Sequence, residues 1–247
     1  MLADKEKHVF KAGARFDTSF ELYKFDRVLR LQILREIEKV EVAVRARVIY
    51  LCSHQYGPFW FMEPSHFRNP ISHSKTLTNL SGEVDRSDED FILAFKNKYS
   101  DPMPPSWMTF EVASFGSVSR LYQNLKPGRT RRAVAHSFGL NDHVFISWLH
   151  TLVYVRNVCA HHARLWNRTL GIIPEIPRTT HKQWLTKPGV NPRKVYFLLS
   201  MILYLHHSVN PHNTFAEKIK NLFKDHPNVD PSAMGFPLDY EKEPLWA

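Results

Sequence analysis

The strongest constraint on the fold is an uninterrupted helical pattern over residues 19–52, a stretch without glycine or proline. Its apolar positions recur every three or four residues, as on one buried stripe: Leu22, Phe25, Leu29, Ile33, Ile37, Val40, Val44, Val48 and Leu51. This spacing predicts a single long helix, with the intervening arginines and glutamates mostly on a solvated face. The helix should end near Tyr56, because Gly57 and Pro58 interrupt the pattern.

Helical patterns recur along the rest of the chain. Further helices are predicted over 88–98, about 109–125, a short segment after Arg132, the stretch 141–168, 195–205 and 214–223. Gly116, inside the 109–125 pattern, suggests a close contact between helices. Residues 64–87 should form loops around one short helix, 170–189 an irregular excursion, and the tail after Pro227 only short-range structure.

These elements place the chain in the all-α fold class. The sequence contains no internal repeat and no convincing alternating strand pattern. We therefore expect a bundle of long antiparallel helices with irregular insertions. A single domain over 1–247 should have its core at about 18–168, with C-terminal helices over 192–224.

Composition excludes several classes of protein. The N-terminal residues are charged and lack a signal-peptide pattern, and the longest apolar run, 195–205, is too short to cross a bilayer. The only cysteines are Cys52 and Cys159, which excludes a disulfide scaffold and a zinc site made of several cysteines. We expect a cytoplasmic protein without a membrane partner.

The candidate site is a polar cluster that follows an apolar helical pattern. Asn141 or Asp142 can cap the start of this helix, and apolar residues fill its middle. The pattern then changes to Arg156, Asn157 and, four residues after Asn157, His161. Residues four apart share a helical face, and the long arginine side chain can reach across to it.

These residue types suit cleavage of an RNA phosphodiester without a metal. The reaction removes a proton from the 2′-OH, gives one to the 5′-leaving oxygen and builds negative charge at phosphorus. Histidine can carry protons near neutral pH, arginine matches phosphate oxygens, and asparagine can orient either group. We take Arg156, Asn157 and His161 as candidate catalytic residues, with a histidine that is merely part of the structure as the alternative.

Positive charge surrounds this cluster. The chain carries a net charge of +9, and residues 120–170 hold eight lysines and arginines but one acid, Asp142. Candidate RNA-binding residues are Lys126, Arg129, Arg131, Arg132, Arg164 and Arg168. The turn 126–132 delivers four of these cations to a helix start, where backbone amides favour phosphate. A basic patch centred on the site suggests a nucleic-acid partner, with a merely solvated basic face as the alternative.

A metal or cofactor site finds little support. Cys159, His161 and His162 could ligate a metal, but consecutive positions point to different faces of a helix. The sequence contains no glycine-rich phosphate loop, acid pair or nucleophilic serine motif. We therefore expect neither a metal nor a cofactor.

Three stretches of the sequence resemble one known family. RNVCAHHARLWNR, from Arg156, looks like the R-N-x-x-x-H signature of the HEPN superfamily of ribonucleases, in the form found in Abi-like (abortive infection, AbiD/AbiF type) bacterial anti-phage proteins. Residues 22–48 and 104–125 also match this family, in the same order. Arg156 and His161 correspond to its catalytic pair and Asn157 to its supporting amide, while His162 is adjacent to the signature histidine.

The resemblance implies an α-helical HEPN domain with metal-independent endoribonuclease activity. It also implies a homodimer whose two motifs meet in a composite active site, and a role in phage defence. RNA is the expected substrate. An associated non-coding RNA and an antitoxin are further expected partners. The alternatives are a non-catalytic protein that holds a structured or guide-like RNA in a defence complex, and a helical interaction module.

Overall fold

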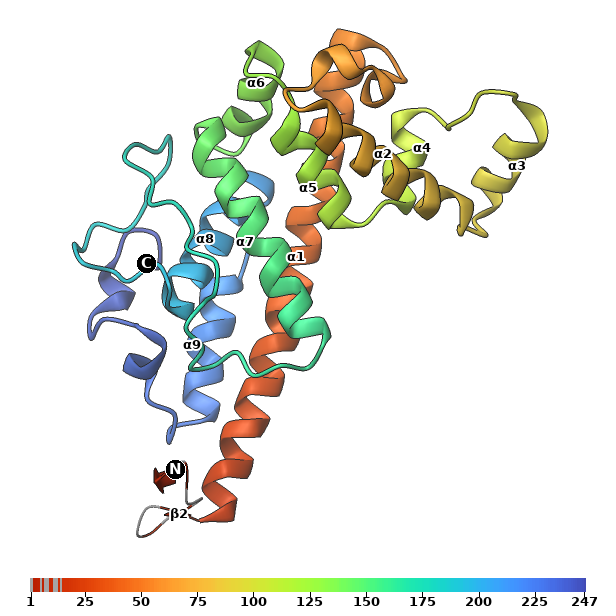
Figure 1. The fold of residues 1–247 in the computed structure, drawn as a ribbon. Helices are drawn as coiled ribbons and strands as arrows, with labels where there is room; N and C mark the ends of the chain where they lie inside the picture. The colour runs from red at the N-terminus through yellow and green to blue at the C-terminus, as the bar shows by residue number, and fades with distance from the viewer. Residues whose placement is uncertain (1, 5, 7–8, 11–12, 14) are drawn as a thin grey trace.

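The structure, a computed structural model, describes residues 2–247 except 5, 7–8, 11–12 and 14. The chain is predominantly helical, which confirms the all-α prediction (Figure 1). Its helices are α1 Phe16–Tyr56, α2 Pro70–Asp85, α3 Asp90–Lys98, α4 Ser106–Val112, α5 Phe115–Asn124, α6 Arg129–Ser137, α7 Asp142–Ala160, α8 Val195–Val209 and α9 Phe215–Asp225. Short 3₁₀ turns are η1 Trp60–Met62, η2 Pro64–His66, η3 Pro231–Met234 and η4 Tyr240–Lys242.

Helix α1 is the axis of the molecule. It is 41 residues long, or about 60 Å at 1.5 Å per residue, and it packs against α4 to α9. Its buried stripe follows the predicted spacing, from Phe25 and Leu29 to Val48 and Cys52. The helix ends at Gly57, whose positive φ of 89° suits glycine. The predicted long helix is confirmed.

Helix α7 lies antiparallel to α1 and packs against both α1 and α5 (Figure 1). Asn141 caps its start, since its side-chain oxygen accepts a 2.9 Å hydrogen bond from the amide of Val144. Trp148 is fully buried, and its indole N–H donates to the carbonyl of Glu175 in the segment that follows α7. This segment, 161–194, contains no regular helix or strand. The sequence predicted an irregular course only for 170–189, and the predicted extension of the helix to Arg168 is wrong, because the chain turns at His162, whose φ is 57°.

The C-terminal helices close the other side of the core. Almost every side chain of α8 is buried. Glu36 of α1 contacts both C-terminal helices, because its carboxylate lies 3.1 Å from His206 of α8 and 2.9 Å from Lys218 of α9. The tail after Pro227 forms short turns, but it also packs firmly, because Trp246 is fully buried and its indole donates to Ser200. The core therefore extends beyond the residues expected to build it.

Three expectations about local structure were incomplete. The predicted helix over 109–125 is two helices, because Ser114 caps a new start and its oxygen accepts from the amide of Ser117. Residues 64–87 contain the 16-residue helix α2, started by Asn69 and Pro70, rather than one short helix. Near the N-terminus, β1 Leu2–Asp4 and β2 Val9–Phe10 form a small antiparallel pair that no sequence pattern indicated.

Candidate functional site

Helix α7 ends in a tight turn that carries two histidines. His161 caps the helix, with its amide donating to the carbonyl of Asn157 at 2.9 Å. His162 follows with φ of 57°, the one non-glycine residue with positive φ in the described part of the chain. The amides of His162 and Ala163 then close the turn onto Cys159 and Val158. This is a Schellman motif with histidine at the position where glycine is usual.

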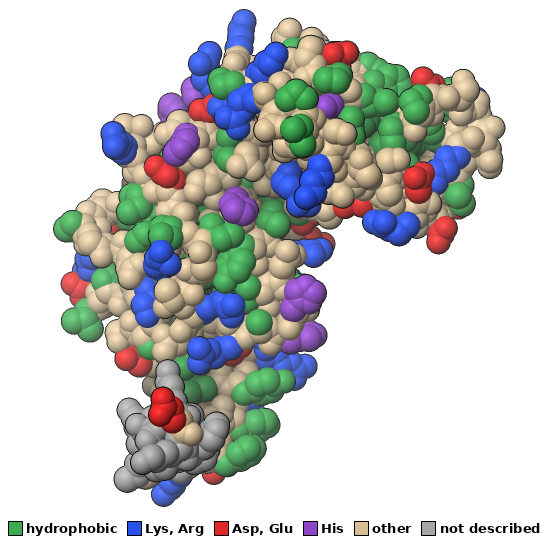
Figure 2. Space-filling view, in the orientation of Figure 1, with side chains coloured by type: hydrophobic (Ala, Val, Ile, Leu, Met, Phe, Trp, Pro, Cys, Tyr) green, Lys and Arg blue, Asp and Glu red, His purple; other side chains and the backbone are tan. Residues whose placement is uncertain are grey.

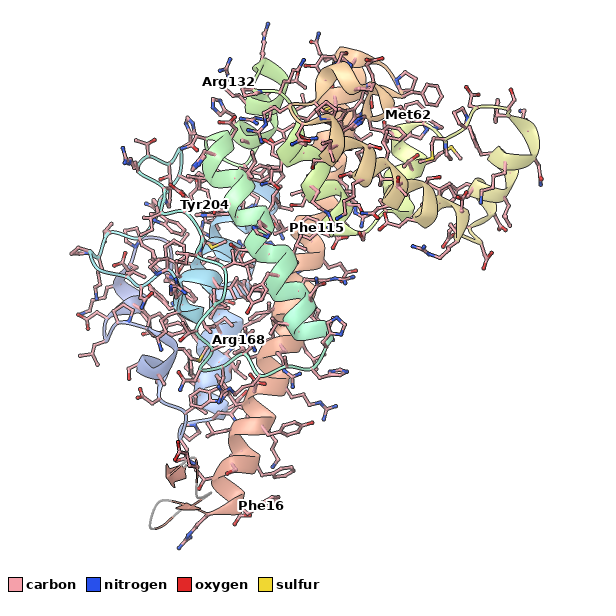
Figure 3. The ribbon with its side chains drawn as sticks, in the orientation of Figure 1. Phe16, Met62, Phe115, Arg132, Arg168 and Tyr204 are labelled. Carbon is pink, nitrogen blue, oxygen red and sulfur yellow. The ribbon has the colours of Figure 1, made fainter. Side chains whose placement is uncertain are left out.

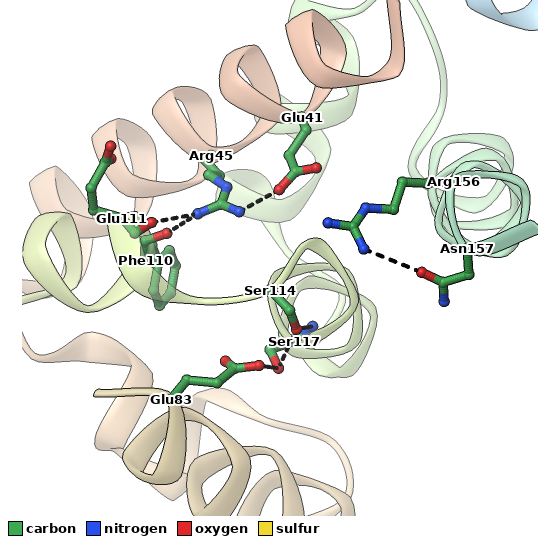
Figure 4. A network of polar contacts seen from close by, with 9 residues as sticks. All are labelled: Glu41, Arg45, Glu83, Phe110, Glu111, Ser114, Ser117, Arg156 and Asn157. Carbon is green, nitrogen blue, oxygen red and sulfur yellow. Dashed lines mark hydrogen bonds and ion pairs between the residues drawn. The ribbon is translucent and has the colours of Figure 1, made fainter. Parts of the chain in front are cut away.

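The candidate catalytic side chains are exposed around this end of α7. Arg156, Asn157 and His161 are all open to solvent. The contact made by the Arg156 guanidinium is a long hydrogen bond of 3.5 Å to the side-chain oxygen of Asn157 (Figure 4). The imidazole of His161 makes no hydrogen bond, ion pair or ring contact within the part of the chain that the structure describes. Both groups are therefore available to a ligand.

Arg156 stands between two surface grooves. One, of about 730 Å³, runs along α1 and α4 and is lined by residues that include Arg45, Trp107 and Glu111. The other, of about 440 Å³, lies between α5 and α7 and is lined by Arg120, Gln123, His150, Arg156 and Asn157, among others. The nearby Arg45 is held by Glu41 and by backbone carbonyls (Figure 4), so Arg156 is the more available guanidinium.

A buried carboxylate ties the chain after the histidines to α1. One side-chain oxygen of Asp26 accepts the amides of Leu165 and Trp166 at 2.8 and 2.7 Å. Its other oxygen pairs with Arg30 at 3.1 Å, with both side chains almost fully buried. Because His161 lies only four residues before Leu165, this anchor fixes the turn in place against α1.

Arg131 was wrongly assigned to the RNA-binding surface. Its side chain is buried, pairs with Asp142 at 2.5 Å and donates to the carbonyl of Leu125 at 3.0 Å. Arg131 thus joins the start of α7 to the end of α5. The single acid of the basic region is used in this pair, which is why the arginine is not free for phosphate.

The remaining basic candidates lie at two ends of α7. Lys126, Arg129 and Arg132 are exposed around the start of α6, whereas Arg164 and Arg168 follow the histidine turn. Figure 3 shows Arg132 and Arg168 far apart along the molecule. Since α7 has 19 residues, its ends are about 28 Å apart. The expected patch centred on the site is therefore two separate basic regions.

Arg164 and Arg168 differ in their availability. The Arg164 side chain is exposed, but Arg168 is half-buried and donates to the hydroxyl of Tyr154 at 3.1 Å and to the Arg164 carbonyl at 3.0 Å. Of this pair, Arg164 is the freer cation. The assignment of either residue to RNA remains a prediction.

The family was decided by comparison with known proteins. A family model described as Abi-like protein matches residues 1–167, about two thirds of the chain. The chain belongs to the Abi-like protein family. Membership supports a function of the abortive-infection type. No curated protein and no solved structure matches the chain.

The three stretches that carried the resemblance converge in this Abi-like protein. The lining of the groove of about 730 Å³ includes Leu31 to Ala46 of α1, Trp107 and Glu111 of α4, and Arg156 of α7. These belong to the first, second and third matching stretches, respectively. The matched part of the chain also ends just beyond the histidine turn.

Two residues beside the motif were missed as site candidates. Arg120 and His150 line the α5–α7 groove together with Arg156, and both side chains are exposed. Arg120 comes from α5, so no sequence spacing could have grouped it with the motif. His150 lies seven residues before Asn157 on α7, a spacing that places both on one helical face and could have identified it. Gly116 lies in the same groove, and a β-carbon there would be 3.6 Å from Val153 of α7, an ordinary contact. It does mark a helix contact, as expected, but glycine is not required by space.

The described residues give no support for a metal site or a membrane span. No group of three or more histidine, cysteine or acidic side chains lies together among them. Cys159 is buried, and burial raises the pKa of its thiol to about 12, which opposes the thiolate that a metal would need. No helix within the described chain combines the length and apolar character that a bilayer crossing requires.

Proposed function

We propose that this Abi-like protein is a metal-independent endoribonuclease of the HEPN type, acting in a bacterial anti-phage abortive-infection system. The observation that carries the proposal is the exposed set of Arg156, Asn157 and His161 at one end of α7. Other arginines and histidines of the core form buried ion pairs, such as Arg30 with Asp26, Arg131 with Asp142 and His206 with Glu36. The Arg156 guanidinium has one long hydrogen bond and lies five residues before the exposed His161 at the same end of α7, and this pair suits a phosphodiester better than a role in the fold.

Each of the three residues has a separate role in RNA cleavage. His161 takes the proton of the 2′-OH as its oxygen attacks phosphorus, or gives a proton to the 5′-oxygen as it leaves. The products are a 2′,3′-cyclic phosphate and a free 5′-hydroxyl. Arg156 binds the phosphate oxygens and stabilises the charge that grows in the transition state. Asn157, 3.5 Å from Arg156, orients the guanidinium.

One chain supplies one clear acid–base at this motif, whereas the reaction needs both proton transfers. A homodimer that joins two motifs would supply two histidines, as the family resemblance implies. RNA is the substrate in this proposal, and an associated non-coding RNA or an antitoxin would regulate it. The proposed location is the cytoplasm, where cellular RNA is available.

A binding protein without catalysis is the second candidate. The separation of about 28 Å between the cations at α6 and the motif favours it, because a protein that only holds RNA needs a long basic surface. Arg120 and His150 lie between these ends, in the α5–α7 groove. The same path would serve a nuclease that holds its RNA at several points.

Chelation tests the proposed chemistry. Purified protein incubated with total RNA in excess EDTA should cleave at an undiminished rate, because the site itself supplies a cation and a proton carrier. End-group mapping should find 2′,3′-cyclic phosphates and 5′-hydroxyls. Loss of cleavage in EDTA with recovery in Mg²⁺ would contradict the proposal, and tight binding without any cleavage would favour the binding protein.

The salt dependence of RNA binding tests the basic surface. Replacing Arg129 and Arg132 with alanine should weaken binding and lower the slope of log affinity against log salt by roughly 0.7 to 0.9 per lost phosphate contact. Arg120→Ala should lower it by one such step. Arg86→Ala is a matched control, since this exposed arginine lines a groove rich in acids on α2 and α3. An unchanged slope in the first two variants would mean that RNA binds elsewhere.

A further inference from the structure

The outer face of α1 exposes a stripe of large apolar side chains. They lie opposite the buried stripe and are exposed to these fractions: Phe16 80%, Phe20 45%, Tyr23 57%, Leu31 50% and Val42 61%. The first three stack on one another, with ring centroids 6.0 and 6.3 Å apart. Figure 2 shows apolar side chains gathered along the lower part of this helix. Stripes of this kind usually mark a contact with another protein.

We infer that this stripe binds a second copy of the same chain, with the two α1 helices antiparallel. The charges beside the stripe favour a copy over an unrelated partner, because Arg35 and Glu38 are both exposed, one turn apart and opposite in sign. A two-fold axis between them sets Arg35 of each chain against the partner's Glu38. The same axis sets Leu31 against the partner's Val42. The surface is therefore complementary to itself in both charge and apolar character.

The available area is suited to a stable dimer. Each exposed aromatic or large aliphatic side chain of the stripe offers on the order of 100 Å². With Trp107, which is 52% exposed beside the same groove, six such side chains give on the order of 600 Å². The arginines and glutamates at the edges bring this close to the ~800 Å² per partner of a standard interface.

The position of the stripe connects the dimer to the candidate site, and this step rests on the proposed function. Arg156 lines the groove formed by Leu31 and Val42, and Asp26 anchors the chain just after the histidine turn. The motif therefore lies beside the segment of α1 through which the two-fold axis passes. A second copy placed there covers the groove and brings its own Arg156 and His161 to the same region. The dimer would supply the second acid–base that one chain lacks.

Substitutions on the stripe test the surface by molecular mass. Sedimentation equilibrium of the intact protein over a range of concentrations should find a dimer. Leu31→Asp and Val42→Asp should each weaken it by roughly 100-fold, because a carboxylate from each copy would be buried among apolar groups. Ile71→Asp is the control, since Ile71 is 84% exposed on α2 and away from the stripe. It should leave the dimer unchanged.

Charge reversal tests the antiparallel register. Arg35→Glu alone sets like charges against the partner's Glu38, and Glu38→Arg alone does the same with the opposite sign, so each should weaken the dimer by about 10-fold. The double variant R35E/E38R reverses both charges and should restore it. Failure of the double variant to restore the dimer would overturn this register. A protein that is monomeric at every concentration would overturn the interface.

Cleavage assays on the same variants separate this inference from the proposed nuclease. Val42→Asp should lose RNA cleavage in proportion to its loss of dimer and recover it at high protein concentration. Full cleavage by a strict monomer would overturn the shared surface and leave the nuclease standing. A dimer that Val42→Asp dissociates, but that cleaves no RNA, would support the surface and overturn the nuclease.

Discussion

His161→Ala should lower the rate of RNA cleavage by roughly 10² to 10⁴-fold, the usual contribution of a general acid–base. RNA affinity should stay within about a few-fold, because every nearby arginine remains and the imidazole makes no hydrogen bond or ion pair within the described residues. Single-turnover cleavage and equilibrium binding of one RNA oligonucleotide measure the two effects separately. Binding and chemistry should therefore separate in this variant.

Matched controls make this result specific to His161. His162→Ala changes the neighbouring exposed histidine and should leave most of the cleavage rate, since His162 is not the signature residue. Arg156→Ala should reduce both binding and cleavage, because its charge serves the bound phosphate as well as the transition state. A folded His161→Ala protein that cleaves at the wild-type rate would end the nuclease assignment at this motif.

Mixed dimers test whether the site is composite. Chains with Arg156→Ala and chains with His161→Ala should both be inactive alone. If the dimer forms two sites that each take arginine and histidine from different chains, a mixed dimer retains one complete site and regains part of the activity. A single joint site that requires both histidines would leave the mixed dimer inactive. Sites built within one chain would leave the mixture inactive.

Asp26→Ala should lower the free energy of unfolding by about 3 to 5 kcal/mol, the usual cost of leaving one partner of a buried ion pair alone. It removes the acceptor for the amides of Leu165 and Trp166 and leaves the buried Arg30 without its carboxylate. The histidine turn also loses its anchor on α1. Urea denaturation measures the stability, and the RNA cleavage rate reports on the turn.

Two further substitutions separate the loss of the buried charge from the general effect of removing a carboxylate from α1. Asp26→Asn retains an oxygen for the two amides but removes the charge, so it should cost less than alanine. Asp17→Ala removes an exposed carboxylate near the start of α1 and should change stability by no more than about 0.5 kcal/mol. An Asp26→Ala protein as stable as the wild type would mean that the anchor contributes nothing to the fold.

Long helices with a clear apolar stripe could be predicted from the sequence. The pattern from Leu22 to Leu51 has no breaker, and it became α1 with its ends near the expected residues. Polar α2 was predicted only as a short helix within 64–87, because its burial depends on a few positions such as Leu80 and Val84. The split between α4 and α5 was missed because the cap at Ser114 competes locally with a continuous helix.

The sequence by itself determined the helical class, the long helix, the family resemblance and the choice of Arg156, Asn157 and His161. These depend on local spacing, which a linear chain displays directly. Only the tertiary structure decided which cations are free, because burial and pairing join residues far apart in the chain. Arg131 pairs with Asp142, and Asp26 holds a turn nearly 140 residues away. Arg120 of α5 and Arg156 of α7 line one groove. Such contacts arise when helices pack, and charge alone does not reveal them.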